Sequence, residues 1–157
     1  MNEKLRNIEL ERAKLAQECI DKVELMEHEI KGVKGKFTSY VRRLLAAIPV
    51  DGIVRVLTFM ASKAKADGIR CVTKWINNEE GLEKLDSEPA AYAIIYYYVM
   101  RCLHERLEID INIREDPLNP LRYLASDYNL ARRASKEALA FLVWVKRFAE
   151  ALFEVSR

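Results

Sequence analysis

Apolar residues recur at intervals of three and four positions along most of the chain, the spacing that gathers them on one side of an α-helix. Over residues 3–31 this pattern predicts a long amphipathic helix, whose apolar side holds Leu5, Ile8, Leu15, Cys19, Val23, Met26 and Ile30. Gly32 and Gly35 interrupt the pattern, and a second helix is predicted from Lys36 to Ile48, where Pro49 ends it.

The middle of the chain predicts three further segments. Asp51 is placed to cap a third helix over residues 52–66, and a shorter helix follows over residues 69–77. Residues 77–89 are rich in Asn and Glu, contain Gly81 and predict a flexible connection. From Pro89 to Leu107, apolar or aromatic side chains cover most of the helical circumference. We therefore expect this segment to be the central, most buried helix.

The last third of the chain predicts a loop followed by a long helix. Residues 108–120 contain two prolines and break the helical pattern, and residues 120–126 predict one or two helical turns. Asp127 is then placed to cap a final helix from Tyr128 to Val155. The sequence as a whole predicts an all-α fold, a bundle of six to seven helices with long N- and C-terminal helices, in which residues 1–157 form a single helical domain.

Composition and charge change this picture little. The 26 Lys and Arg residues nearly balance the 24 Asp and Glu residues, so any basic surface must be local. Three cysteines, Cys19, Cys71 and Cys102, lie in helical apolar patterns and predict reduced thiols in a cytoplasmic protein. No apolar run approaches the ~20 residues that a membrane span needs, so we expect no membrane partner.

Local signatures of catalysis are missing from the sequence. It has no Gly-rich phosphate loop, no nucleophile elbow and no paired metal-ligand spacing, so we expect no cofactor and no metal site. His28 lies among acidic residues on an exposed helix face, and His104 is expected to be half-buried and hydrogen-bonded. The three consecutive tyrosines at 96–98 point about 100° apart on a helix, which favours core packing over a shared base-stacking surface.

The final helix carries a face of mixed character. Its predicted core side holds Leu130, Ala134, Ala138, Phe141, Val145, Phe148 and Leu152. The opposite side holds Arg132, Lys136, Leu139, Val143, Lys146 and Arg147, and no acid interrupts it until Glu150. The cations are consistent with ordinary solvated surface and also with contacts to nucleic-acid phosphates. Leu139 and Val143 argue against plain solvated surface, because aliphatic side chains among cations predict that a partner protein or another segment of the chain covers them.

Two other basic clusters could join this surface. Arg42 and Arg43 lie off the apolar side of the second helix. Arg55, Phe59 and Lys63 share the outer side of the third, where two cations flanking an aromatic ring suit phosphate binding and base stacking. The sequence favours the packing of Phe59 against another helix, and it leaves the base-stacking interpretation open.

Two separated segments resemble the small subunit of the CRISPR type III-B effector, the Cmr complex. One covers residues 52–64 and the other residues 126–152, where the matching positions are Asp127, Tyr128, Lys136, Glu137, Ala138, Trp144, Lys146, Arg147, Phe148 and Ala149. The resemblance implies a non-catalytic helical subunit of an antiviral RNA-targeting complex. Such subunits stack on one another as a minor filament beside the backbone subunits that carry the crRNA, and they contact the large subunit and the target RNA.

The resemblance assigns a place at the nucleic-acid groove to Lys63, Lys136, Lys146 and Arg147. Arg132, Arg42 and Arg43 are added by the surface pattern alone, with Leu139 and Val143 as protein-interface residues. The alternative is a free-standing helical adaptor or nucleic-acid-binding regulator, although no helix-turn-helix spacing with base-reading residues is present. An enzyme ranks last, because it would need scattered His, Cys and acidic residues to meet in the fold.

Overall fold

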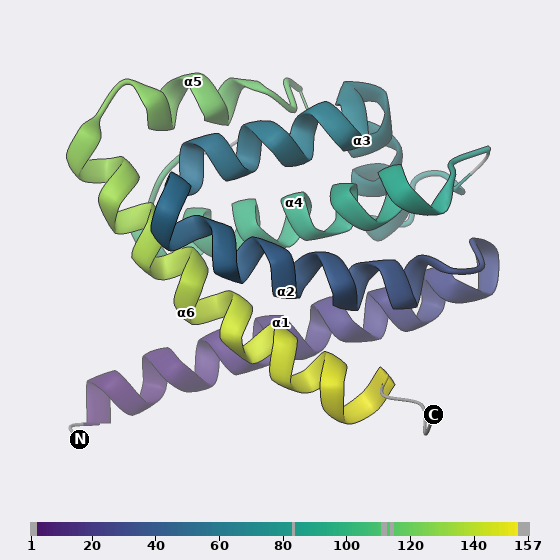
Figure 1. Ribbon diagram of the computed structural model, residues 1–157, viewed down its shortest axis with the longest axis horizontal. Coiled ribbons are helices and arrows are strands. Elements are labelled where there is room, and N and C mark those ends of the chain that lie inside the picture. Colours follow the sequence, from purple (N-terminus) through teal and green to yellow (C-terminus); the bar gives the residue numbers. More distant parts are fainter. Residues whose placement is uncertain (1–2, 83, 111–112, 114, 154–157) are drawn as a thin grey trace.

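In the computed structural model, which describes residues 3–82, 84–110, 113 and 115–153, the chain is an all-α bundle (Figure 1). The helices in those ranges are α1 Glu3–Glu29, α2 Val33–Asp51, α3 Ile53–Ile76, α4 Ser87–Leu107, α5 Asn119–Ala125 and α6 Tyr128–Phe153. The described residues contain no β-strand. The predicted fold class is therefore confirmed. No helix among these residues has both the length and the apolar character to cross a bilayer.

The helix α4 is the central helix, as predicted, and lies between its neighbours in Figure 1. Every residue from Ala90 to Met100 is buried. The tyrosines at 96–98 are core residues, and two of their hydroxyls have internal acceptors. The Tyr96 hydroxyl donates to the Pro117 carbonyl at 2.6 Å, and the Tyr98 hydroxyl donates to Glu18 at 3.1 Å. Hydrogen bonding offsets the penalty of burying these polar groups.

The helix α2 begins three residues earlier than the sequence predicted. Gly32 adopts a left-handed conformation (φ 94°), and Gly35 lies inside the helix. The Glu27 carboxylate accepts hydrogen bonds from the backbone N–H of Gly32 at 2.9 Å and of Lys34 at 2.8 Å. This side chain satisfies donors that the first turn of a helix leaves without partners. The prediction that Pro49 ends α2 was also wrong, because the helix continues to Asp51.

The corner between α2 and α3 corrects a second prediction. Asp51 is the last residue of α2 and does not cap α3; Gly52, with φ 82°, occupies the cap position and offers no side-chain bond. The first N–H of α3, on Ile53, donates instead to the Ser135 hydroxyl of α6 at 3.0 Å. The start of α3 is thus attached to α6. The break predicted between helices over residues 52–66 and 69–77 is present as a kink in α3 at Lys65, whose backbone is non-helical (φ 64°, ψ 157°).

The helix α6 begins as predicted, because the Asp127 carboxylate accepts from the Leu130 N–H at 3.1 Å. Most of its core side is confirmed, but Leu152 is exposed and Phe153 is buried in its place. Its predicted end at Val155 lies outside the described residues. Leu5 was also placed in the core and is exposed, because the first turns of α1 project beyond the rest of the bundle (Figure 1).

Candidate nucleic-acid interface

The outer side of α6 carries four cations, which we call the α6 basic face. Arg132, Lys136 and Arg147 are exposed, and Lys146 is half-buried. Within the described part of the chain, none of the four forms an ion pair. Their positive charge is therefore not offset by carboxylates of the same molecule among those residues, and it is available to an anionic partner.

The two glutamates in the described part of α6 explain why this face keeps its charge. Glu150 lies beside it on the helix but accepts hydrogen bonds from the Arg42 guanidinium of α2 at 3.0 and 3.2 Å. Glu137 turns inward and is only 7% exposed. Both acids are bound to arginines of other helices, so neither is placed to neutralise the outer lysines.

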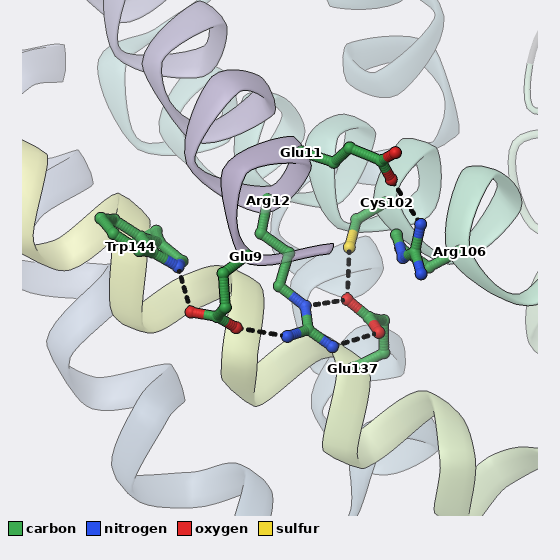
Figure 2. A network of polar contacts seen from close by, with 7 residues as sticks. All are labelled: Glu9, Glu11, Arg12, Cys102, Arg106, Glu137 and Trp144. Carbon is green, nitrogen blue, oxygen red and sulfur yellow. Dashed lines mark hydrogen bonds and ion pairs between the residues drawn. The ribbon is translucent and has the colours of Figure 1, made fainter. Parts of the chain in front are cut away.

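The inward-facing glutamate belongs to a polar network that joins α1, α4 and α6 (Figure 2). The Arg12 guanidinium donates to both carboxylate oxygens of Glu137, at 2.7 and 2.8 Å, and also to Glu9. Glu9 accepts from the Trp144 indole at 3.0 Å, and the Cys102 thiol donates to Glu137 at 3.5 Å. The hydrogen bond to Glu137 is the main cause that raises the pKa of Arg12 above its usual value. The network fixes α1 against α6.

The two aliphatic residues predicted among the cations differ in the structure. Val143 is 36% exposed and lies on the outer side of α6. Leu139 is partly buried and packs against the hydrophobic core, so its expected free exposure was wrong. The helix contacts α1, α2 and α4, which makes its buried arc wider than one apolar stripe. The assignment of both residues to a protein interface stays a prediction.

The two arginines predicted on α2 have separate environments. Arg42 is engaged by Glu150, so it is not the free cation that the sequence suggested. Arg43 is exposed, and its guanidinium carbon lies 4.8 Å from the centroid of the Tyr40 ring. Cation–π contacts of this kind hold a guanidinium in place while leaving its edge open to an anion.

A groove of about 350 Å³ opens between α2 and α3, and we call it the α2–α3 groove. Its lining consists of Tyr40, Arg43, Leu44, Ala47, Asp51, Arg55, Val56, Phe59 and Tyr92. Phe59 is 45% exposed and makes an edge contact with Tyr92, with 5.7 Å between ring centroids. The Lys63 ammonium lies 5.7 Å from the Phe59 centroid. The cations and the aromatic ring predicted together on α3 therefore do share one surface.

The start of α3, close in sequence to the groove residue Arg55, is hydrogen-bonded to α6. Ser135, which accepts the hydrogen bond from Ile53 at the start of α3, lies within one helical turn of Arg132 and Lys136.

Cys19, Cys102 and His104, which the sequence offered as candidate catalytic groups, all lie in the described part of the chain. Burial raises the pKa of the Cys19 and Cys102 thiols, which keeps both in the weakly nucleophilic protonated form. His104 is exposed, which corrects the expected half-burial, although its Nδ1 is within hydrogen-bond distance of the Ile109 carbonyl oxygen. Among the described residues, no group of three or more His, Cys, Asp or Glu side chains is placed to hold a metal ion.

Sequence reasoning missed the aromatic lining of the groove. Tyr40 of α2 and Tyr92 of α4 stack with ring centroids 4.1 Å apart and an interplanar angle of 9°. Tyr92 belongs to the helix that the sequence marked as buried, so no local signal placed it beside a surface groove. The spacing of Tyr40 and Arg43, three positions apart on one helix, was a signal that could have been used.

Comparison with known proteins identifies relatives of the chain. Residues 8–152 match the family model described as "CRISPR-associated protein (Cas_Cmr5)". A chain in a cryo-EM structure of the type III-B Cmr-beta bound to cognate target RNA and AMPPnP is 25% identical, with a TM-score of 0.73; the match covers 93% of this chain and 98% of that one. A chain in the type III-B Cmr-beta complex bound to non-cognate target RNA shares the fold at 24% identity and a TM-score of 0.71, covering 92% and 97%.

Proposed function

Because the chain belongs to the Cas_Cmr5 family of CRISPR-associated proteins, we propose that it is a structural, non-catalytic subunit of a type III-B ribonucleoprotein complex in the cytoplasm. In this proposal, copies of the chain stack as a minor filament along the crRNA–target RNA duplex, next to the backbone and large subunits. The α6 basic face holds the target RNA. The similar structure with cognate target RNA supports both the assembly and the nature of the nucleic acid.

One observation carries the RNA-holding role, namely the uncompensated charge of the α6 basic face. The chain carries 26 basic and 24 acidic residues, and the four cations of the α6 basic face lie together on one side of a single helix. Here both glutamates of the described part of α6 are bound to arginines from α1 and α2, while Arg132, Lys136 and Arg147 stay exposed. Phosphates pair with such cations independently of sequence, as a subunit that accepts any target RNA requires.

The environment of the titratable groups supports a non-catalytic role. The thiols of Cys19 and Cys102 are buried and hold their protons, and Glu137 is committed to Arg12. A general base or nucleophile needs a free, correctly protonated group in reach of substrate. Cleavage of the target RNA is then the task of other subunits.

The subunit role is tested by mixing the purified chain with crRNA and the other Cmr-type subunits and measuring co-elution. Stable incorporation is expected, and failure to join the assembly would contradict the proposal. The assembled complex should then be compared with one that carries Lys136→Glu, Lys146→Glu and Arg147→Glu. Target-RNA affinity should fall, while the composition of the complex stays the same.

Salt dependence gives this comparison its quantitative form. Each lost phosphate contact reduces the magnitude of the slope of log K against log salt by about 0.7 to 0.9, so the loss of three contacts should reduce it by about 2 to 3. The matched control reverses the charge of three exposed lysines in α1 or just after it, with Lys4→Glu, Lys14→Glu and Lys31→Glu. The control changes the net charge equally and should leave the slope almost unaltered. Equal losses in both variants would show that overall charge, and not the α6 basic face, governs binding.

Stacking requires a contact between copies of the chain or with neighbouring subunits, and Val143 is the exposed apolar residue amid the cations. In the complex, Val143→Asp should lower the number of copies incorporated, as measured by native mass spectrometry. The variant should keep the thermal stability of the isolated chain, because the side chain lies on the outer surface. An unchanged copy number would remove Val143 from the interface.

A further inference from the structure

The α2–α3 groove takes no part in the role proposed for α6, yet its lining is that of a ligand site. We propose that it binds one unstacked nucleotide of single-stranded RNA, with the base against Phe59 and the phosphate at Arg43 and Arg55. The choice of RNA as ligand rests on the proposed function. The site itself is separate from the α6 basic face.

The aromatic groups of the groove are already arranged for stacking. Arg43, Tyr40 and Tyr92 form a column, with 4.8 Å from the guanidinium to the first ring and 4.1 Å between the two rings. Phe59 stands nearly perpendicular to this column, at an interplanar angle of 87° to Tyr92, and 45% of its surface is exposed. Because the column holds its neighbours in place, little ordering of the groove opposes binding of a flat ligand.

The rim of the groove favours an anionic group on that ligand. Arg43 is exposed, the Arg55 side chain is 79% exposed, and Lys63 lies beside the Phe59 ring. The carboxylates of this region are Asp51, 3.8 Å from Arg55, and Glu88, which acts on the hydroxyls of both stacked tyrosines. Three cations therefore lie near two carboxylates. The distance between Asp51 and Arg55 is longer than a hydrogen bond, so the Arg55 guanidinium can turn to bind a phosphate.

The size of the groove favours a single nucleotide over a partner helix. About 350 Å³ is at the lower end of the range for small-molecule sites and accommodates one planar group with its phosphate. Aromatic surfaces flanked by cations bind bases that have left the stack, because a base in a duplex keeps its faces covered by its neighbours. The start of α3 is hydrogen-bonded to Ser135 of α6, so the groove residue Arg55 lies two positions from a contact with the helix that carries the α6 basic face.

The test uses the isolated, isotope-labelled chain and follows its amide resonances by NMR. A single-stranded hexaribonucleotide, a nucleoside monophosphate, the nucleoside and inorganic phosphate are titrated separately. The hexaribonucleotide and the monophosphate should both shift the resonances of Phe59 and Tyr92. Inorganic phosphate alone should not. Shifts produced by the monophosphate but not by the hexaribonucleotide would identify a free-nucleotide site and overturn the proposal of an RNA strand.

Two pairs of variants isolate the contacts. Phe59→Ala should weaken hexaribonucleotide binding by about 5- to 150-fold, the range for loss of one base-stacking ring, whereas Phe59→Tyr keeps a ring and should bind almost normally. Arg55→Ala should also weaken binding. Arg70→Ala serves as its control, because Arg70 is an exposed arginine on the same helix with an acidic neighbour, Asp67.

The outcomes separate this inference from the proposed function. If Phe59→Ala and Arg55→Ala bind RNA normally while the α6 triple variant does not, the groove proposal is overturned and the α6 role stands. A second outcome is that the Phe59→Ala chain binds RNA normally but no longer joins the assembled complex. The groove would then bind a side chain of another protein, and the proposal is again overturned. Loss of binding in both groove variants, with normal incorporation into the complex, supports the nucleotide site.

Discussion

Replacement of Glu137 by alanine should be strongly destabilising, because the structure places this carboxylate where its loss leaves an arginine without its main partner. The Glu137 side chain is 8% exposed and that of Arg12 is 18% exposed, and two hydrogen bonds of 2.7 and 2.8 Å join them. Breaking a fully buried ion pair by removing one partner costs about 3–5 kcal/mol. Arg12 keeps its ion pair with Glu9, so we expect Glu137→Ala to lower the free energy of unfolding by about 2–3 kcal/mol.

The assay is thermal and urea-induced unfolding of the isolated chain. For a chain of this length, 1 kcal/mol corresponds to about 2–4 °C, so Glu137→Ala should lower Tm by about 5–10 °C. The matched control is Glu150→Ala, on the same helix and also bound to an arginine across a helix interface, but with side chains 37% and 41% exposed. An exposed pair contributes about 0–1 kcal/mol, so the control should lower Tm by no more than about 4 °C.

A double-mutant cycle checks the physical cause. The pair Arg12→Met and Glu137→Met should destabilise less together than either change alone, because the double variant leaves no unpaired buried charge. Similar Tm losses for Glu137→Ala and Glu150→Ala would refute the reasoning that burial sets the strength of these pairs. Strictly additive losses in the cycle would show that Arg12 and Glu137 do not act as a unit.

Three further predictions concern stability and thiol chemistry. Ser135→Ala should destabilise the fold by about 0.5–2 kcal/mol in urea unfolding, because the first N–H of α3, on Ile53, loses its acceptor on α6; Ser135→Thr, which keeps the hydroxyl, should lose less. A maleimide reagent should label Cys71 much faster than Cys19 and Cys102, because both of these are buried and burial raises their pKa. Labelling is followed by mass spectrometry, and Cys71→Ser should abolish its fast phase. Stability should fall as pH rises above about 9, because burial raises the pKa of the Cys19 and Cys102 thiols and of the Tyr96 and Tyr98 hydroxyls, so that these groups ionise first in the unfolded chain; unfolding midpoints at pH 8 and pH 10.5 measure their combined effect. A midpoint that does not change between these pH values would contradict the raised values.

The sequence by itself determined the helices and the identity of the central one. Helical periodicity is a local property, since each apolar position is fixed by its neighbours three and four residues away. This is why α4 was recognised from its apolar circumference and why Asp127 was recognised as the cap of α6. The start of α2 was missed although the Glu27 contacts that support it span only five and seven positions, whereas the start of α3 depends on Ser135, 82 positions away, which no local pattern can supply.

The basic character of α6 was also visible in the sequence, but the burial of the aliphatic side chains on the same face was not. The pattern placed Arg132, Lys136 and Arg147 on one face, and the structure confirms their exposure. It could not show that Leu139 would pack against the core, because the width of the buried arc depends on how many helices surround α6.

Only the tertiary structure decided which charges are free. Glu137 is bound to an arginine 125 positions away and Glu150 to one 108 positions away. Such pairs depend on where distant helices meet, and the sequence alone holds no distance information of that kind. The α6 basic face keeps its charge because both of these acids bind arginines of other helices. The α2–α3 groove has its aromatic lining because the fold packs Tyr92 of α4 against Tyr40 of α2.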